Sequence, residues 1–557
     1  MNTSERASAH VSYTDWNSTD WKAVQMYVTK LRQRIYRAEQ LNQRRKVRKL
    51  QRLLLRSEAN LLLSIRRVTQ QNKGKRTPGV DEHTALSRRE RNQLYKQLKT
   101  QNIFRHRPKP AKRIYIAKKN GKLRPLGIPT IKDRIYQNMV RNALEPQWES
   151  RFEAISYGFR PKRSTHDAIR SIFNRINGGS KKKWIFEGDF KACFDHLNHD
   201  WILKQIPNFP GSPLIERWLQ MGYMERSNFS ETQEGTPQGG TISPLLANIA
   251  LHGMEEALGI TYKKNYKANA SYIINPACKI ALIRYADDFV VLAETKDQAQ
   301  SIHERLRLYL KKRGLELSLE KTKVTQIEQG FEFLGFSVRQ YKTWQGNKLF
   351  IKPSKSSIKK AKEKIRDTLR MMRGQPIGEI IRVLNPIIRG YGQYWKHVVS
   401  KKIFSKLAEY IYWKVRKHLR QLHPRKAWRW IRTRYYKAPH HGGNVNVPTC
   451  PKTNIQLLHM PWIKIERHNM VMYKNSPDDP TLKEYWEKRD RKVFDSENTM
   501  DRMKLARKQG YRCAICRCSL QNGEKVIVKD MSAYQNHSQP NGYVRLVHLP
   551  CLDTVIG

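Results

Sequence analysis

Apolar residues recur at helical spacing near the start of the chain. Between Trp21 and Val68 this spacing predicts two basic helices, with two apolar faces: Val24, Val28, Leu31 and Ile35 on the first, and Leu50, Leu53 and Leu54 on the second. The segment KGKRTPGVD then ends the pattern with Gly74, Pro78 and Gly79. We expect helices that contribute to a core, followed by a loop.

The hydrophobic pattern changes twice further along. From about residue 113 to 338, short apolar runs alternate with helical stretches and turn residues, which is typical of a mixed α/β domain. After residue 355, helical spacing returns and predicts a three-helix element, with these apolar stripes: Ile358, Ala361, Ile365 and Leu369; Ile377, Ile380, Ile381, Leu384 and Ile388; Phe404, Leu407, Ile411 and Val415. Beyond Pro439 the composition indicates an irregular linker.

The charge of the chain indicates a polyanionic partner. Its 557 residues include 107 Lys and Arg but only 48 Asp and Glu, a formal charge of +59, while 39% apolar residues suffice for folded cores. Residues 355–437 alone hold 24 Lys and Arg against 4 Asp and Glu. Nucleic acid is the natural partner, because phosphate contacts supply binding of this kind. A basic surface kept only for solubility is the alternative.

Two groups of carboxylates point to chemistry. Asp287 and Asp288 lie within IRYADDFVVL, between apolar runs of strand character, which predicts a strand, a tight turn and a second strand. Asp189 ends another apolar run, in WIFEGDFKACFD. Three such acids suit two Mg²⁺ ions that catalyse phosphoryl transfer. Taken by itself, the turn could also be an exposed acidic hairpin.

Ordered motifs around these acids resemble the reverse transcriptase family, and most closely the group II intron-encoded proteins. They are RIYIAKKNGKLRPLGIPTIKDRIYQ, SYGFRPKRSTHDAI, GDFKACFD, GTPQGGTISPLLANIAL, YADD, GLELSLEKTKV, FEFLGFSV and the maturase-like LNPIIRGYGQYW. The resemblance covers roughly residues 60 to 440. It implies a right-hand polymerase of α/β class, with fingers and palm, an α-helical thumb or maturase X domain, and a small C-terminal region.

The same resemblance implies roles for single residues. Lys118 and Arg124 would contact the incoming triphosphate, and the backbone near Phe190 would join the Mg²⁺ ligands. Phe194 would exclude a ribose 2′-hydroxyl, whereas otherwise it is a core aromatic. Gln238 and Gly239 would lie by the templating pair, against the alternative of a plain turn. Lys321 would protonate the pyrophosphate, unless it is one more surface lysine.

The C-terminal cysteines suggest a metal site. Seven cysteines are spread too unevenly for a disulfide framework, but two ligand pairs with three-residue spacing, Cys513 with Cys516 and His548 with Cys551, could bind Zn²⁺. Free thiols are the alternative. The tail resembles an HNH endonuclease in outline, yet Lys529, Asp530 and Leu552 stand where that family has histidines. We therefore expect its nuclease activity to be lost.

Together these features predict a reverse transcriptase and maturase that works as a ribonucleoprotein. The expected regions are a helical extension at 1–60, fingers and palm at 61–350, thumb at 351–440, a DNA-binding region at 441–500 and the zinc module at 501–557. Expected partners are the intron RNA, as precursor and lariat, target DNA and dNTPs. No membrane segment is expected, and the bacterial cytoplasm or nucleoid is the expected location. An RNA-dependent RNA polymerase and a splicing factor with a decayed polymerase are the alternatives.

Overall fold

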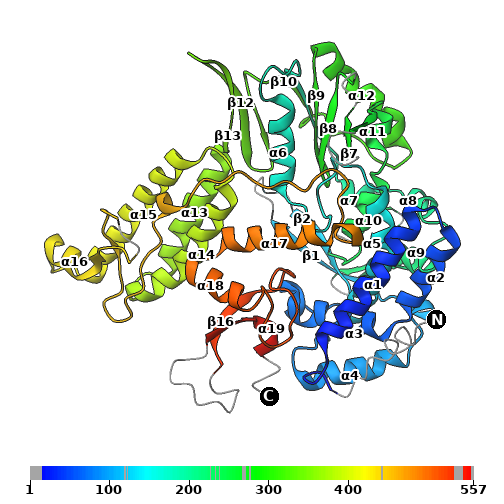
Figure 1. The fold of residues 1–557 in the computed structure, drawn as a ribbon, viewed down its shortest axis with the longest axis horizontal. Helices are drawn as coiled ribbons and strands as arrows, with labels where there is room; N and C mark the ends of the chain where they lie inside the picture. The colour runs from blue at the N-terminus through cyan, green and yellow to red at the C-terminus, as the bar shows by residue number, and fades with distance from the viewer. Residues whose placement is uncertain are drawn as a thin grey trace.

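The computed structural model describes residues 15–117, 121, 123–225, 228–232, 234–236, 239–265, 271–274, 278–440, 443–531 and 544–552. Figure 1 shows the N-terminal helices on one side of the molecule and the helices α13 to α16 on the other. Helix α17 and the C-terminal elements lie between them. Among the described helices, none has both the length and the apolar character needed to cross a bilayer.

The N-terminal region contains more helices than the sequence pattern predicts. Three α-helices replace the expected two: α1 (Trp21–Gln40), α2 (Arg44–Leu55) and α3 (Glu58–Arg66). The third begins because the Ser57 side chain accepts the backbone N–H of Asn60, an N-cap. Leu50 and Leu54 are buried as predicted, but Leu53 was assigned wrongly, since it is 46% exposed. Helix α4 (Arg88–Lys99) follows after two short turns, Arg67–Gln71 and Lys73–Arg76.

The fingers consist of a four-stranded sheet in the order β2-β1-β4-β5. Its strands are β1 (Ala111–Ala117), β2 (Leu123–Ile128), β4 (Tyr223–Glu225) and β5 (Asn228–Ser230). Strands β1 and β2 pair antiparallel and form a two-stranded ribbon. Helix α5 (Ile131–Arg151) follows β2 and packs against α1, α2 and α3, so it joins the fingers to the N-terminal helices.

The palm is built on an antiparallel sheet in the order β10-β3-β9-β8. The strands are β3 (Trp184–Asp189), β8 (Ala281–Tyr285), β9 (Asp288–Ala293) and β10 (Lys323–Gln326). Helices α6 (Thr165–Ile176) and α12 (Lys296–Lys311) pack against it. The remaining elements are α7 (Cys193–His196), α8 (His199–Gln205), α9 (Ser212–Gln220), α10 (Ser243–Ala250), α11 (Met254–Ala257) and the hairpin of β6 (Tyr262–Asn265) with β7 (Ser271–Ile274).

The thumb confirms the predicted three-helix element. A sheet of β11 (Phe331–Phe333), β12 (Phe336–Thr343) and β13 (Gly346–Pro353) leads into α13 (Lys355–Met371), α14 (Ile377–Trp395) and α15 (Lys401–Leu422). Most predicted stripe residues are buried, among them Ile365, Leu384 and Ile411. Helix α16 (Trp428–Tyr435) follows, and β14 (Tyr436–Lys437) pairs with β15 (Val447–Pro448). The basic residues therefore fall mainly on the outer faces.

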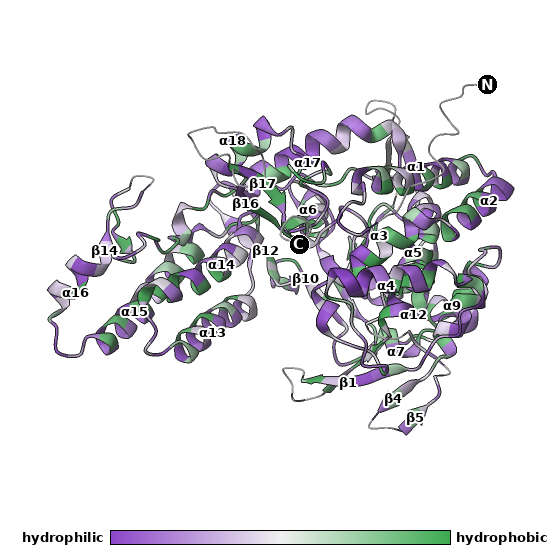
Figure 2. Cartoon of the chain, turned by 90° about the horizontal axis from the view of Figure 1, so that it is seen from below, coloured by the Kyte–Doolittle hydropathy of each residue, from purple (hydrophilic) through white to green (hydrophobic). Residues whose placement is uncertain are grey.

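The C-terminal part has a small core of its own. After the turns Met460–Trp462 and Pro480–Leu482 come α17 (Lys483–Glu497), α18 (Met500–Lys508), the antiparallel pair β16 (Val526–Asp530) and β17 (Val544–His548), and α19 (Leu549–Leu552). Phe494, Leu546 and Val547 form part of this core. Figure 2 shows α2 and α17 largely in the hydrophilic colour, as suits helices at the surface.

Candidate active site

Three carboxylates meet at one end of the palm sheet. Strand β3 ends at Asp189 and strand β9 begins at Asp288, and these two residues are register partners. Tyr285 in turn pairs with Asp288, so Ala286 and Asp287 form a two-residue loop between β8 and β9. A two-residue loop of this kind needs a residue with a left-handed backbone conformation, and Ala286 adopts that conformation with φ 58°. The sheet thus brings the three predicted acids together, although about 100 residues separate Asp189 from the other two in the chain.

The electrostatics of this cluster favour a bound cation. Lost hydration, followed by the nearby charges of Asp287 and Asp189, raises the pKa of Asp288 to about 6. Burial likewise raises the pKa of Asp287, with Asp189 adding to the effect. Crowded carboxylates resist ionising together, and divalent cations with oxygen ligands relieve that repulsion. The donor set therefore fits Mg²⁺.

Two basic residues act on the acids. The Lys321 ammonium donates a hydrogen bond to Asp189 Oδ2, which raises the pKa of Lys321. Arg124 is exposed on β2, and its charge helps to hold down the pKa of Asp287. Lys321 and Arg124 therefore lie at the site. Lys118 falls outside the described residues.

A buried network supports the turn that carries Asp287, and the sequence pattern alone did not single out this network. Arg284 is fully buried and donates through Nη1 to the Ala286 carbonyl and to Asn248 Oδ1, each at 3.2 Å. The Asn248 Nδ2 donates to the Gly158 carbonyl at 2.8 Å. A Cβ added at Gly158 would lie 2.2 Å from the Ala286 nitrogen, so a residue of the SYGFRP motif presses directly on the turn. The sequence feature that could have revealed this network is Arg284, an arginine within an apolar strand pattern.

The two predicted phenylalanines follow Asp189 in the chain, Phe190 directly after β3 and Phe194 in α7. Phe190 is buried, with its ring centroid 5.1 Å from that of Phe289, and it bridges to Leu317. Phe194 is 8% exposed and lines a cleft of about 220 Å³ between the fingers strands and the palm. It is both a packed aromatic and a wall of this cleft, so its two interpretations are compatible.

The GTPQGGTISPLLANIAL motif contacts both Phe194 and the fingers. The Thr236 N–H donates to the Phe194 carbonyl at 2.7 Å. Gly239 has φ 137°, and a Cβ there would lie 2.6 Å from the Gly127 carbonyl of β2, so only glycine permits this approach of palm and fingers. Gln238 falls outside the described residues.

Comparison with known proteins gives consistent family matches. Residues 116–338 match the family described as reverse transcriptase (RNA-dependent DNA polymerase), 16–98 its N-terminal domain, and 358–436 the group II intron maturase-specific domain. Protein YkfC of Escherichia coli (strain K12) is 36% identical over 314 residues, which cover 52% of this chain and 82% of that protein. The chain belongs to the group II intron-encoded reverse transcriptases.

Two further relatives of this reverse transcriptase come from introns. The group II intron-encoded protein LtrA of Lactococcus lactis subsp. cremoris is 34% identical over 324 residues, which cover 48% of this chain and 53% of LtrA. An uncharacterized 91 kDa protein in the cob intron of Schizosaccharomyces pombe is 30% identical over 369 residues, which cover 54% of this chain and 45% of that protein. The chain thus matches about half the length of these two relatives. The three family matches end at residue 436, before the tail.

The tail of this reverse transcriptase brings the four predicted metal ligands together. One ligand atom each of Cys513, Cys516, His548 and Cys551 lies within 4.8 Å of the others. The Cys516 sulfur is 3.3 Å from His548 Nδ1. The predicted convergence is confirmed, and the soft sulfur and imidazole donors are those that Zn²⁺ prefers.

This cluster also docks on the N-terminal region. Arg66 of α3 forms a buried ion pair with Glu524 at 3.2 Å and donates to the Cys551 sulfur at 3.4 Å. The same guanidinium lies 4.6 Å from the ring centroid of Trp21. The sequence offered no signal for this contact, because the partners lie 458 residues apart.

Proposed function

We propose that this chain synthesises DNA on an RNA template at a pair of Mg²⁺ ions. Asp189, Asp287, Asp288 and the backbone near Phe190 would hold the ions. The observation that carries the proposal is the register of β3 and β9, which sets Asp189 across from Asp288 beside the Asp287 turn. When bound, the two ions lower the pKa of the primer 3′-hydroxyl and stabilise charge on the triphosphate.

The surrounding residues would position the reactants. Arg124, with Lys118, contacts the triphosphate of the incoming dNTP, as charge-assisted hydrogen bonds allow. Phe194 closes the cleft beside the sugar and excludes a 2′-hydroxyl, which argues for deoxynucleotides over ribonucleotides. Gln238 and Gly239 lie by the templating pair, and Lys321 donates a proton to the leaving pyrophosphate.

Binding of intron RNA is the second part of the proposal. The maturase-specific match at 358–436 and the strong positive charge of the same helices support it. Helices of this kind track a duplex through phosphate and 2′-hydroxyl contacts. With the N-terminal region they stabilise the active fold of the intron, whose RNA performs the splicing chemistry. As a ribonucleoprotein with lariat RNA in the bacterial cytoplasm, the protein then copies the intron into target DNA near the nucleoid.

Substitution of one acid tests the separation of these two activities. In Asp287→Asn, cDNA synthesis should fall at least about 10³-fold, because the variant loses a ligand charge at the reacting centre. Stimulation of intron splicing should stay close to that of the parent. Asp297→Asn, an acid in the first turn of α12 beyond the far end of β9, is the matched control and should retain both activities. Loss of both activities in a folded Asp287→Asn protein would contradict the proposal. Incorporation of rNTPs in preference to dNTPs would favour an RNA polymerase.

For the tail we propose a Zn²⁺-stabilised module that contacts DNA and does not cut it. Its support is the clustered Cys513, Cys516, His548 and Cys551, together with Lys529 and Asp530 on β16 where an HNH site needs histidines. We also propose the region boundaries at residues 60, 350, 440 and 500. A nicking assay with the protein, its intron RNA and target DNA tests whether the tail cuts DNA. Specific cleavage that is lost on truncation before Asp501 would refute it.

A further inference from the structure

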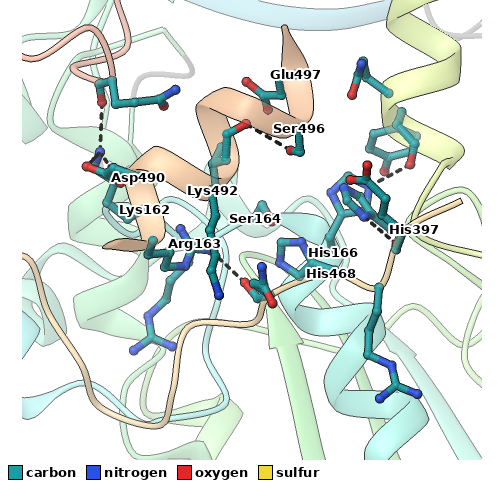
Figure 3. A pocket seen from close by; sticks show the side chains of 18 of the residues that line it. Lys162, Arg163, Ser164, His166, His397, His468, Asp490, Lys492, Ser496 and Glu497 are labelled. Atoms are coloured by element: carbon teal, nitrogen blue, oxygen red, sulfur yellow. Dashed lines mark hydrogen bonds and ion pairs between the residues drawn. The ribbon is translucent and has the colours of Figure 1, made fainter. Parts of the chain in front are cut away.

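Three histidines from three parts of the chain converge at one place in the fold. His166 lies in palm helix α6, His397 just after thumb helix α14, and His468 in the connector that precedes α17. One ring nitrogen of each lies within 4.8 Å of the others. Figure 3 shows the three residues on one side of a pocket of about 520 Å³, with Lys162 and Asp490 on the other.

Each imidazole has an oxygen acceptor next to one of its ring nitrogens. His166 Nε2 lies 2.7 Å from the Tyr394 carbonyl, and His397 Nδ1 lies 3.0 Å from the Glu466 carbonyl. His468 Nε2 lies 3.2 Å from the carboxylate of Asp167. A carbonyl or carboxylate can only accept, so each of these nitrogens carries the proton. The other nitrogen of each ring is left with its lone pair.

Each ring therefore offers one lone pair to a ligand. A neutral imidazole whose far N–H is held by a carbonyl or carboxylate is the form in which histidine binds metals. If the three histidines only filled space in the core, they would not all need an oxygen acceptor at one ring nitrogen.

We propose that His166, His397 and His468 bind a zinc ion whose fourth position opens into the pocket. Imidazole donors suit Zn²⁺, and three protein ligands with one open position are a common arrangement for it. Ligands about 2.1 Å from a tetrahedral zinc lie roughly 3.4 Å apart. From a separation of at most 4.8 Å, each ring must move by less than about 1 Å to reach this geometry.

The charges nearby are compatible with a divalent ion. Lys396 and Arg489 are close, but each faces an acid: Lys396 lies 3.4 Å from Glu466, and Arg489 lies 3.9 Å from Asp167. The remaining positive charge favours an anionic fourth ligand such as hydroxide. Because the ligands come from α6, the end of α14 and the C-terminal connector, the ion would fasten palm, thumb and tail to one another.

Metal analysis of the full chain tests the proposal. A background with Cys513→Ser, Cys516→Ser and Cys551→Ser removes all three thiolate ligands of the tail cluster, so that zinc held there does not mask the histidine site. Measured by mass spectrometry, this background should still hold one equivalent of zinc, and adding His397→Asn should remove it, with affinity at least about 100-fold weaker. His303→Asn, an exposed histidine on α12, is the matched control and should retain the ion. Equal zinc in a folded His397→Asn protein would overturn the proposal.

A second measurement needs no substitution among the three histidines. The metal-stripped chain with Cys513→Ser, Cys516→Ser and Cys551→Ser is titrated with Co²⁺, whose visible bands report its ligands. One equivalent should bind and give bands without the thiolate charge-transfer absorption expected of the cysteine cluster, and Zn²⁺ should displace it. If this chain takes up no Co²⁺ and no Zn²⁺, the histidine site does not exist.

Discussion

Gly158 lies against the Ala286–Asp287 turn, and this contact allows a specific prediction. A Cβ at residue 158 would lie 2.2 Å from the Ala286 nitrogen and 2.8 Å from the Tyr285 carbonyl carbon. Ordinary contact begins near 3.4 Å, so in Gly158→Ala the turn must recede by about 1.2 Å. Both neighbours are backbone atoms, which cannot rotate away as a side chain could.

That displacement moves Asp287 and Asp288 relative to Asp189. Since a misplacement of about 1 Å can cost roughly 10²-fold in rate, we expect a drop of that size in single-turnover primer extension on an RNA template. Intron RNA binding should not change, because the thumb lies elsewhere. Gly179→Ala is the matched control, since its added Cβ meets nothing within 4 Å. A Gly158→Ala rate within about threefold of the parent, at equal thermal stability, would refute this reasoning.

Three further changes have expected outcomes. Phe194→Val should reduce the preference for dNTP over rNTP by about 10-fold or more, because exclusion by size contributes about 1–3 kcal/mol to such a preference. Single-nucleotide incorporation with dNTP and rNTP measures this preference. An unchanged ratio would count against a steric role of Phe194. Arg66→Met should destabilise the docked tail by about 3–5 kcal/mol, because Glu524 keeps a buried charge; limited proteolysis of the tail should accelerate. A chelator should raise hydrogen exchange around Cys513 and Cys551 but not in the palm sheet, and no change would mean that the cluster needs no metal.

Features that depend on residues close together in the chain were predictable. Asp189 at the end of an apolar run and the acids of YADD needed only an ordinary antiparallel pairing to meet, and the register provides it. The tail ligands come in pairs with three-residue spacing, so two short segments suffice to assemble them. The thumb helices followed from regular stripes of apolar residues.

Features that depend on distant packing were not predictable. His166, His397 and His468 share no spacing, and only the docking of thumb and connector on α6 unites them. The pressure of Gly158 on Ala286 likewise exists only in the folded palm. Leu53 was predicted to share the buried face of α2 with Leu50 and Leu54, but only the latter two are buried. Helical spacing alone cannot say how much of a short basic helix the contact with α5 covers.

The pairing of Arg66 with Glu524 has a consequence for biosynthesis. A ribosome that adds about 5–20 residues per second needs roughly 20–90 s to travel the 458 residues between them. Throughout that interval the guanidinium beside Trp21 has no counterion from the tail and stays accessible to water. The N-terminal helices therefore reach their final surroundings only late in translation, when the tail with its cysteine cluster has emerged and packed against them.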